Sequence, residues 1–265
     1  MKIARFEDAT GHGQYGIITV SPCGCRGQEA DLIEGNLFGT FRATGRKATI
    51  RRLLAPVDPP NIVAIGLNYR AHAQESGQPL PERPVLFSKA TTALLDPEAP
   101  IVLPPVAPDE VDYECELAIV IGRRARNVPA ERALDYVLGY TCGNDVSARD
   151  VQLRLDSQWV RGKSFDTFCP LGPWIETDLD PASAPIRTRL NGRVMQESNT
   201  SDLIFSCAEL IAFLSAGMTL LPGTVIMTGT PSGVGFARKP PVFLRSGDVV
   251  EIEVEGIGVL RNPVA

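Results

Sequence analysis

Two glutamates in one short segment are the residues best suited to chemistry in this chain. Glu114 and Glu116 lie in residues 112–121, whose apolar and β-branched residues predict a strand that ends at Gly122. Side chains two positions apart project from the same face of a strand, so the two carboxylates are expected to lie close together. Their repulsion and desolvation must be offset by a basic partner, a shared proton or a divalent cation. We favour a metal site with oxygen ligands.

A third acid, Asp145, follows the apolar segment 137–143, which predicts another buried strand. Residues 147–155 are predicted to form a helix, so Asp145 lies at a strand-to-helix junction. Functional acids are common at such junctions, because the backbone there is both fixed and exposed. The alternative is an acid that only complements the helix dipole.

His72 and Glu75 lie in a predicted short helix over residues 67–77, with Asn68 as its N-cap. Residues three apart share a helix face, so the carboxylate can orient the imidazole as a general base. Taken alone, this spacing is also typical of an incidental polar pair on a surface helix.

Lys163 and Thr230 lie in segments without a strong periodic pattern. Residues 161–174 are predicted to be a loop, in which Lys163 is either on the surface or paired with an anion in a cleft. Thr230 belongs to the glycine-rich loop 229–235, which follows a predicted strand. Such a loop can present backbone N–H groups and a hydroxyl to an anion.

The composition excludes several classes of function. A net charge of -5 argues against a nucleic-acid-binding surface, and no apolar run approaches the roughly 20 residues of a membrane helix. Two histidines are too few for multi-histidine zinc or haem sites. Six scattered cysteines, with no export-signal pattern at the start, indicate a reduced cytoplasmic protein.

The many glycines and prolines, 24 and 22, favour short strands and turns over long helices. We predict a small β-rich N-terminal domain at residues 1–55, ending in a short helix near 49–54, and a second domain at 56–265. The G-x-G-x-x-G motif at residues 11–16 is predicted to be a turn, because a strand and not a helix follows it. Cys23 and Cys25 are predicted to lie in a loop and not in a zinc site.

Five segments, in this order, resemble the fumarylacetoacetate hydrolase family. They are residues 112–117, 144–150, 162–166, 229–235 and 247–250. The resemblance covers about residues 56–265.

The resemblance implies an α+β, mainly β fold, a mixed β-sandwich roll with the small β-rich N-terminal domain added. It also implies a divalent ion, Mg²⁺ or Mn²⁺, a 2-oxo acid substrate and a homodimer. By motif, the implied metal ligands are Glu114, Glu116 and Asp145. The implied catalytic residues are His72, Glu75 and Lys163, and the implied substrate-binding residues are Arg149, Gln152, Lys163 and Thr230.

The implied chemistry is a metal-stabilised enolate of a 2-oxo acid. The His72–Glu75 pair favours hydrolytic C–C cleavage of an acylpyruvate-type substrate. The alternatives are an oxaloacetate decarboxylase, a 2-hydroxyhepta-2,4-diene-1,7-dioate isomerase/decarboxylase of aromatic catabolism, and a catalytically silent protein that binds 2-oxo acids.

Overall fold

The computed structural model describes residues 1–19 and 28–265, so Cys23 and Cys25 lie outside the described residues. Its largest sheet has twelve strands, with the main path β4-β3-β2-β1-β13-β11-β10-β16-β6-β7. The other two strands, β5 and β8, pair with β1 and β13. The strands of this sheet are β1 Lys2–Glu7, β2 Gly13–Ile18, β3 Glu29–Gly35, β4 Phe41–Thr49, β5 Arg52–Leu53, β6 Ile62–Gly66, β7 Val85–Lys89, β8 Leu94–Leu95, β10 Cys115–Ile121, β11 Val137–Asn144, β13 Cys169–Glu176 and β16 Val225–Met227.

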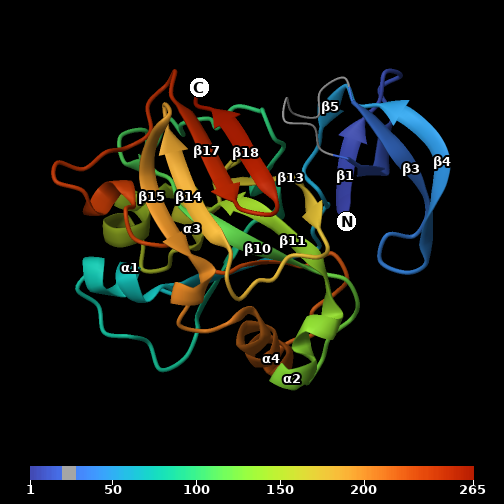
Figure 1. The fold of residues 1–265 in the computed structure, drawn as a ribbon. Helices are drawn as coiled ribbons and strands as arrows, with labels where there is room; N and C mark the ends of the chain where they lie inside the picture. The colour runs from blue at the N-terminus through green and yellow to red at the C-terminus, as the bar shows by residue number, and fades with distance from the viewer. Residues whose placement is uncertain (20–27) are drawn as a thin grey trace.

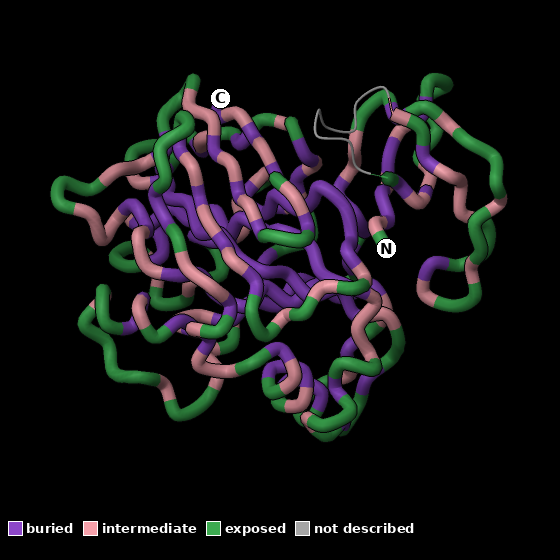
Figure 2. The backbone as a smooth tube through the Cα atoms, in the orientation of Figure 1, coloured by how far each residue is buried: buried purple, intermediate pink, exposed green. Residues whose placement is uncertain are grey.

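A second sheet of four strands, in the order β15-β14-β17-β18, lies across the central strands of the first (Figure 1). Its strands are β14 Pro185–Leu190, β15 Arg193–Asn199, β17 Val249–Val254 and β18 Gly258–Pro263. Burial is concentrated where the two sheets meet (Figure 2), and every residue of β10 is buried. A two-stranded ladder joins β9 Val111–Asp112 to β12 Ser147–Ala148.

The helices are short and lie around the sheets. They are α1 Arg70–Glu75, α2 Ala130–Ala133, α3 Val160–Lys163 and α4 Cys207–Gly217, with 3-10 turns η1 Thr91–Ala93, η2 Leu134–Tyr136, η4 Thr200–Asp202 and η5 Gly235–Ala237, and a π-helical turn η3 Val151–Leu155. None of the described helices is long and apolar enough to span a membrane. The predicted fold class, α+β and mainly β, is confirmed.

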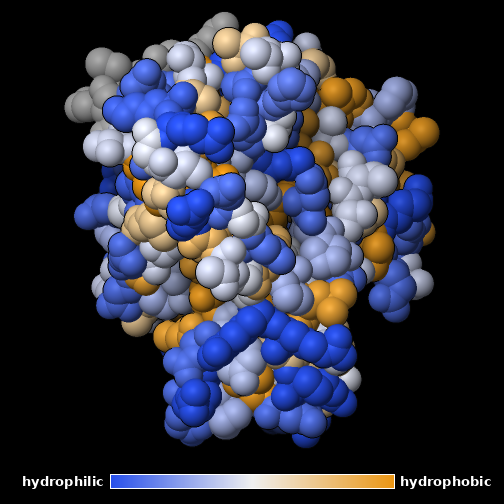
Figure 3. All heavy atoms as spheres, turned by 90° about the vertical axis from the view of Figure 1, so that its right-hand side faces the viewer, coloured by the Kyte–Doolittle hydropathy of each residue, from blue (hydrophilic) through white to orange (hydrophobic). Residues whose placement is uncertain are grey.

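The N-terminal strands join the main sheet directly, because Lys2 and Ile3 of β1 pair with Glu176 and Ile175 of β13. The helix predicted near residues 49–54 is wrong. The N–H of Leu54 donates to Arg5 O, and β5 pairs with β1 as a strand. The boundary at residue 55 stays a prediction. No helix follows the glycine motif at 11–16, as expected, but the motif is not a turn throughout, because its residues 13–16 already belong to β2. Figure 3 shows that the side of the molecule seen there is largely hydrophilic, with hydrophobic residues scattered over it.

Three other local predictions need correction. The helix predicted over 147–155 begins two residues later than expected. Ser147 and Ala148 form strand β12, because Ser147 pairs with Asp112, and residues 149–155 are helical, with η3 at the end. The loop predicted over 161–174 contains the end of α3 and the start of β13. Asn68 does not cap α1; its amide instead donates to the carbonyl oxygens of Phe205 and Thr228, and Tyr69 takes the cap position.

Candidate active site

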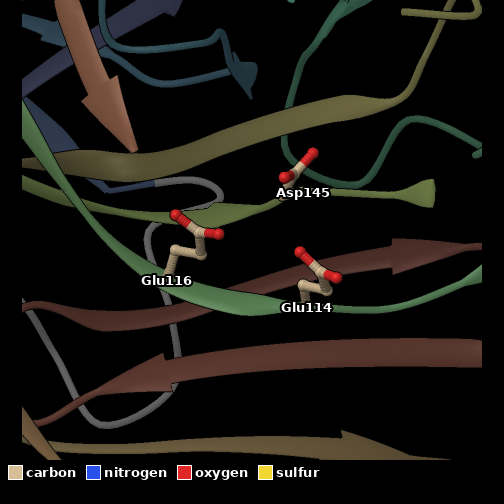
Figure 4. Close-up of side chains that lie close together, drawn as sticks. All are labelled: Glu114, Glu116 and Asp145. Carbon is tan, nitrogen blue, oxygen red and sulfur yellow. The ribbon is translucent and has the colours of Figure 1, made fainter. Parts of the chain in front are cut away.

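The three predicted metal ligands lie together. One carboxylate oxygen from each of Glu114, Glu116 and Asp145 lies within 4.8 Å of the other two, and all three residues are buried. Figure 4 shows the two glutamates on one stretch of chain, Glu116 within β10 and Glu114 just before it, with Asp145 beside them just after β11. The pairing of β10 with β11 produces this cluster, because it places Cys115 opposite Asn144. The N–H of Asp145 donates to Glu114 O at 3.0 Å, which fixes the two acids side by side.

Two cations hold Glu114 in its charged form. Lys163 Nζ lies 2.8 Å from Glu114 Oε2, and Arg149 Nη2 lies 2.7 Å from Oε1. Burial alone would raise the pKa of Glu114, but the charges of Lys163 and Arg149 outweigh it and lower that pKa to about 2. Arg149 also contacts Asp112 and Gln152, which orient its guanidinium.

Asp145 lies between two buried lysines. Lys163 Nζ contacts Asp145 Oδ2 at 2.7 Å, and Lys89 Nζ contacts Asp145 Oδ1 and the carbonyl of Val146. Burial would lower the pKa of Lys163, but Asp145 and Glu114 outweigh it and raise that pKa. Lys163 is only 2% exposed, so the alternative of a surface lysine in a loop is wrong.

Glu116 differs from the other two acids, because no cationic side chain among the described residues forms an ion pair with it. Its Oε2 accepts the N–H of Gly229 at 2.7 Å. Burial and then the charges of Asp145 and Glu114 raise the pKa of Glu116 well above its ordinary value. A divalent cation among the three carboxylates would supply the missing positive charge, and hard oxygen ligands of this kind suit Mg²⁺ or Mn²⁺. The residues present therefore fit such an ion.

A cavity of about 550 Å³ opens above the acids. Its polar lining holds seven of the predicted site residues: His72, Glu114, Glu116, Arg149, Gln152, Lys163 and Thr230. Its apolar lining includes Ile65, Leu67, Val85, Phe87, Leu153, Trp159 and Phe236. A hollow of about 630 Å³ borders β6 and β7, but no carboxylate residue lines it. The chemistry therefore belongs to the smaller cavity.

Helix α1 covers one side of this cavity and carries the His72–Glu75 pair. His72 Nδ1 lies 3.2 Å from Glu75 Oε2, so the imidazole can present Nε2 as its free nitrogen. The N–H of Gly233 donates to Glu75 Oε1 at 2.9 Å, which ties α1 to the glycine-rich loop. Burial would raise the pKa of Glu75, but the hydrogen bonds from His72 and Gly233 lower it.

The structure thus brings all nine predicted site residues to one place. Asp145 and Glu75 do not line the cavity, but they contact the lining residues Lys163 and His72. Sequence reasoning missed Lys89, the pairing of Asp112 with Arg149, and the buried Gln196, which donates to Thr230. The only signal for Lys89 in the sequence was its position at the end of the strand-like segment 85–89. Nothing in the sequence indicated that it pairs with Asp145.

The fold and the site together define a β-rich enzyme whose buried acid cluster is suited to an oxygen-ligated metal ion and lies beneath a helical cover. The family model described as "Fumarylacetoacetate (FAA) hydrolase C-terminal" matches residues 61–265. The chain belongs to the fumarylacetoacetate hydrolase family.

Similar proteins carry several names. The chain is 46% identical to the rat protein named "Oxaloacetate tautomerase Fahd2a, mitochondrial", over 80% of this chain and 68% of that one. It is 53% identical to an uncharacterized Archaeoglobus fulgidus protein, over 87% of this chain and 88% of that one. The solved structure of 5-carboxymethyl-2-hydroxymuconate delta-isomerase from Mycobacterium smegmatis has a TM-score of 0.88 at 47% identity, and covers 100% of this chain and 99% of its own.

Proposed function

We propose that this protein is a divalent-metal-dependent tautomerase or isomerase of 2-oxo acids, using Mg²⁺ or Mn²⁺. One observation carries the proposal: a single cavity combines an acid triad that fits such an ion with hydroxyl, ammonium and imidazole groups. A 2-oxo acid offers a carboxylate and a keto oxygen, two hard oxygen donors next to each other. The names of the rat and Mycobacterium smegmatis relatives, a tautomerase and an isomerase, favour proton transfer over other outcomes.

The bound ion would act as a Lewis acid that polarises the keto group and acidifies the neighbouring C–H. Lys163 uses two of its three N–H groups on Glu114 and Asp145, so the third is left for the substrate oxygen. His72 Nε2 takes the proton from carbon 3 while Glu75 holds Nδ1. His72 then delivers that proton to the enolate oxygen and returns to its neutral form, so the substrate is converted from keto to enol without loss of atoms. Thr230 donates its hydroxyl to the substrate carboxylate.

Hydrolytic C–C cleavage of an acylpyruvate is the second candidate. The observation that favours it is the same oriented imidazole, because His72 could take the proton from a water molecule instead of from carbon. The two reactions need the same acid triad and differ in what His72 deprotonates.

A substrate panel tests the proposal. Oxaloacetate, 2-hydroxyhepta-2,4-diene-1,7-dioate and acylpyruvates are incubated with the protein and Mg²⁺ or Mn²⁺, and enol absorbance, pyruvate and carbon dioxide are measured. We expect enol–keto conversion to be the fastest reaction, and chelation to abolish it. Faster pyruvate release from acylpyruvates would favour the hydrolase, and faster carbon dioxide release would favour the decarboxylase. Tight binding of oxalate without any turnover would identify a silent 2-oxo-acid-binding protein.

We also propose a homodimer, which light scattering tests by mass. One observation supports the dimer. Strand β7 is at one end of the main sheet, and two exposed apolar residues, Leu86 of β7 and Val160, lie together along the hollow there. The cytoplasmic location stays a prediction; the name of the rat relative places that protein in mitochondria.

A further inference from the structure

Gln196 of β15 is a buried amide that contacts both the metal-ligand segment and the substrate loop. Its Oε1 accepts the N–H of Cys115, the residue between Glu114 and Glu116, at 3.0 Å. Its Nε2 donates to Thr230 Oγ1 and to the carbonyl of Pro231, both at 2.8 Å. Gln196 is only 1% exposed, so these contacts are not exchanged with solvent.

The partners of Gln196 allow only one orientation of its amide. A backbone N–H can only donate, so the oxygen must face Cys115, and a carbonyl can only accept, so the nitrogen must face Pro231. Thr188 Oγ1 adds a second hydrogen bond to Oε1 at 2.7 Å. The amide therefore uses both acceptor positions of its oxygen and both hydrogens of its nitrogen. Because one of these hydrogens points at Thr230 Oγ1, the Thr230 hydroxyl can only accept a hydrogen bond from Gln196 and cannot donate one to it.

This arrangement decides where the hydroxyl proton of Thr230 points. The hydroxyl oxygen accepts from Gln196, and within residues 1–19 and 28–265 it makes no other hydrogen bond. Thr230 lines the cavity, so its O–H is left to donate toward a ligand there. A donor whose direction is set before binding loses less entropy when an anion arrives.

An irregularity in β15 brings Gln196 into this position. Thr188 pairs with Gln196 but Arg189 pairs with Val194, so Met195 is an extra residue in the strand. Met195 and Gln196 are consequently both buried, although they are neighbours in a strand. Bulges of this kind redirect side chains and are frequent beside active sites. A Cβ on Gly233 would lie 2.3 Å from Met195 O, so the glycine-rich loop packs closely against the bulge.

We propose that Gln196 is a positioning residue, which sets the Thr230 hydroxyl as a preformed hydrogen-bond donor to the carboxylate of the ligand. The proposal rests on the proposed 2-oxo acid function and adds to it a residue outside the cavity lining. According to this proposal, the direction of the Thr230 hydroxyl is determined by Gln196 in β15 and not by the loop to which Thr230 belongs.

Oxalate is the probe for this proposal, because it has the adjacent carboxylate oxygens of a 2-oxo acid and does not react. Calorimetry measures oxalate affinity in the presence of Mg²⁺ for the full chain and its variants. Thr230→Val should weaken oxalate binding about 10-fold to 100-fold, because a hydrogen bond to a charged group is lost. Gln196→Glu should weaken it less, because a carboxyl buried without a cation stays protonated and its single O–H cannot donate to both Thr230 and the carbonyl of Pro231. Gln196→Met, which removes the donor without adding charge, is the second variant and should weaken binding about threefold to tenfold.

The double variants separate positioning from general damage to the fold. In the Thr230→Val background, either substitution of Gln196 should change oxalate affinity less than about twofold, because no hydroxyl remains to be oriented. Thr188→Val removes one hydrogen bond to Gln196 but leaves the amide orientation set by Cys115 and Pro231, so it serves as the matched control. Equal losses with and without the Thr230 hydroxyl would overturn the proposal, as would unchanged affinity in Gln196→Met. If the unsubstituted protein with Mg²⁺ does not bind oxalate, the proposed function fails and this inference fails with it.

Discussion

The acid floor of the cavity and its helical cover are built in different ways. Of the floor residues, Glu116 lies in β10, Glu114 just before it and Asp145 just after β11. The β10–β11 ladder and the hydrogen bond from Asp145 N–H to Glu114 O hold their carboxylates within 4.8 Å of each other. The cover is α1, a helix of six residues, and Glu75 holds it to the opposite loop through hydrogen bonds from Gly233. Backbone ladder bonds keep the floor in place when a ligand enters or leaves. Helix α1 is attached mainly through side chains, Arg70 and Asp202 at its start and Glu75 at its end, and such an attachment can open more easily.

This difference suggests a division of labour. The floor binds the ion and the 2-oxo acid end, and the cover decides which proton moves. Substitutions in the floor should therefore abolish binding and turnover together. Substitutions in the cover should reduce turnover and leave binding intact.

The broadest effect is expected from Glu116→Gln, which should reduce metal binding and turnover together. Glu116 has no ion-pair partner among the described residues, so this substitution removes a ligand charge without leaving a lysine unpaired. Turnover should fall on the order of a thousandfold, because a Lewis acid supplies several kcal/mol of transition-state stabilisation. The metal-free variant should be at least as stable as the unsubstituted protein, since a buried carboxylate with a raised pKa is replaced by a neutral amide.

Titration with Mn²⁺ and thermal unfolding without metal measure these two outcomes. Asp135→Asn, at an exposed acid paired with Arg132, is the matched control and should change neither. Undiminished Mn²⁺ binding by Glu116→Gln would show that the triad is not the metal site.

The next effect concerns the cover. His72→Ala should lower tautomerase turnover about 10²-fold to 10⁴-fold, the usual contribution of a positioned acid–base group. Oxalate affinity with Mg²⁺ should change less than about threefold, because the floor is untouched. Gln74→Ala, at an exposed residue of the same helix, is the control for damage to α1. If His72→Ala loses oxalate binding together with turnover, His72 is needed for binding, and the assignment of binding to the floor alone is wrong.

The next prediction concerns stability and the buried ion pair that Lys89 forms with Asp145 of the floor. Lys89→Met leaves the buried Asp145 with one cation fewer, and we expect the free energy of unfolding to fall by about 3–5 kcal/mol. Lys47→Met is the control, because Lys47 and Glu29 form an exposed ion pair at 3.5 Å, whose loss should cost about 0–1 kcal/mol. Denaturant unfolding of both variants measures the difference. An equal loss of unfolding free energy in the two variants would mean that the buried Lys89–Asp145 pair contributes no more to stability than the exposed Lys47–Glu29 pair.

The floor was more predictable from the sequence than the contacts around it. Alternation along residues 112–121 placed Glu114 and Glu116 on one face, and Figure 4 shows them there. The residues alone did not predict that Asp145 lies beside the two glutamates; that prediction came from the family resemblance. In the structure, the pairing of β10 with β11 brings Asp145 to them.

The errors have a common physical origin in contacts between distant segments. Lys163 was assigned to a loop because α3 has only four residues and no strong pattern of its own. Its geometry depends on packing, since a Cβ on Gly162 would lie 2.8 Å from the backbone nitrogen of Gln152. The helix near 49–54 failed for a similar reason, because pairing with β1 overrode local preference. Gln196 could not be found from sequence, because its position depends on a bulge.

The smallest effect is expected from Glu75→Gln, which weakens the attachment of α1 without removing His72. The folded-state pKa of Glu75 is lowered from its ordinary value of 4.5, so its charge stabilises the closed cover above pH 4.5. That contribution is lost as the pH falls through the lowered value. The variant should lower turnover only about threefold to tenfold at pH 7, because the amide oxygen that it introduces can still accept from Gly233 and His72.

Amide hydrogen exchange of α1, corrected for the effect of pH on intrinsic exchange, measures this attachment. At pH 7 the helix should exchange faster in Glu75→Gln than in the unsubstituted protein. The difference should begin to shrink only below pH 4.5 and should disappear as the pH falls through the lowered pKa of Glu75. Glu82→Gln, at an exposed acid on the segment after α1, should leave exchange unchanged. Equal exchange at pH 7 would mean that contacts other than the Glu75–Gly233 hydrogen bonds hold the cover. The floor and the cover would then be equally rigid, and the proposed division between binding and proton transfer would lose its structural basis.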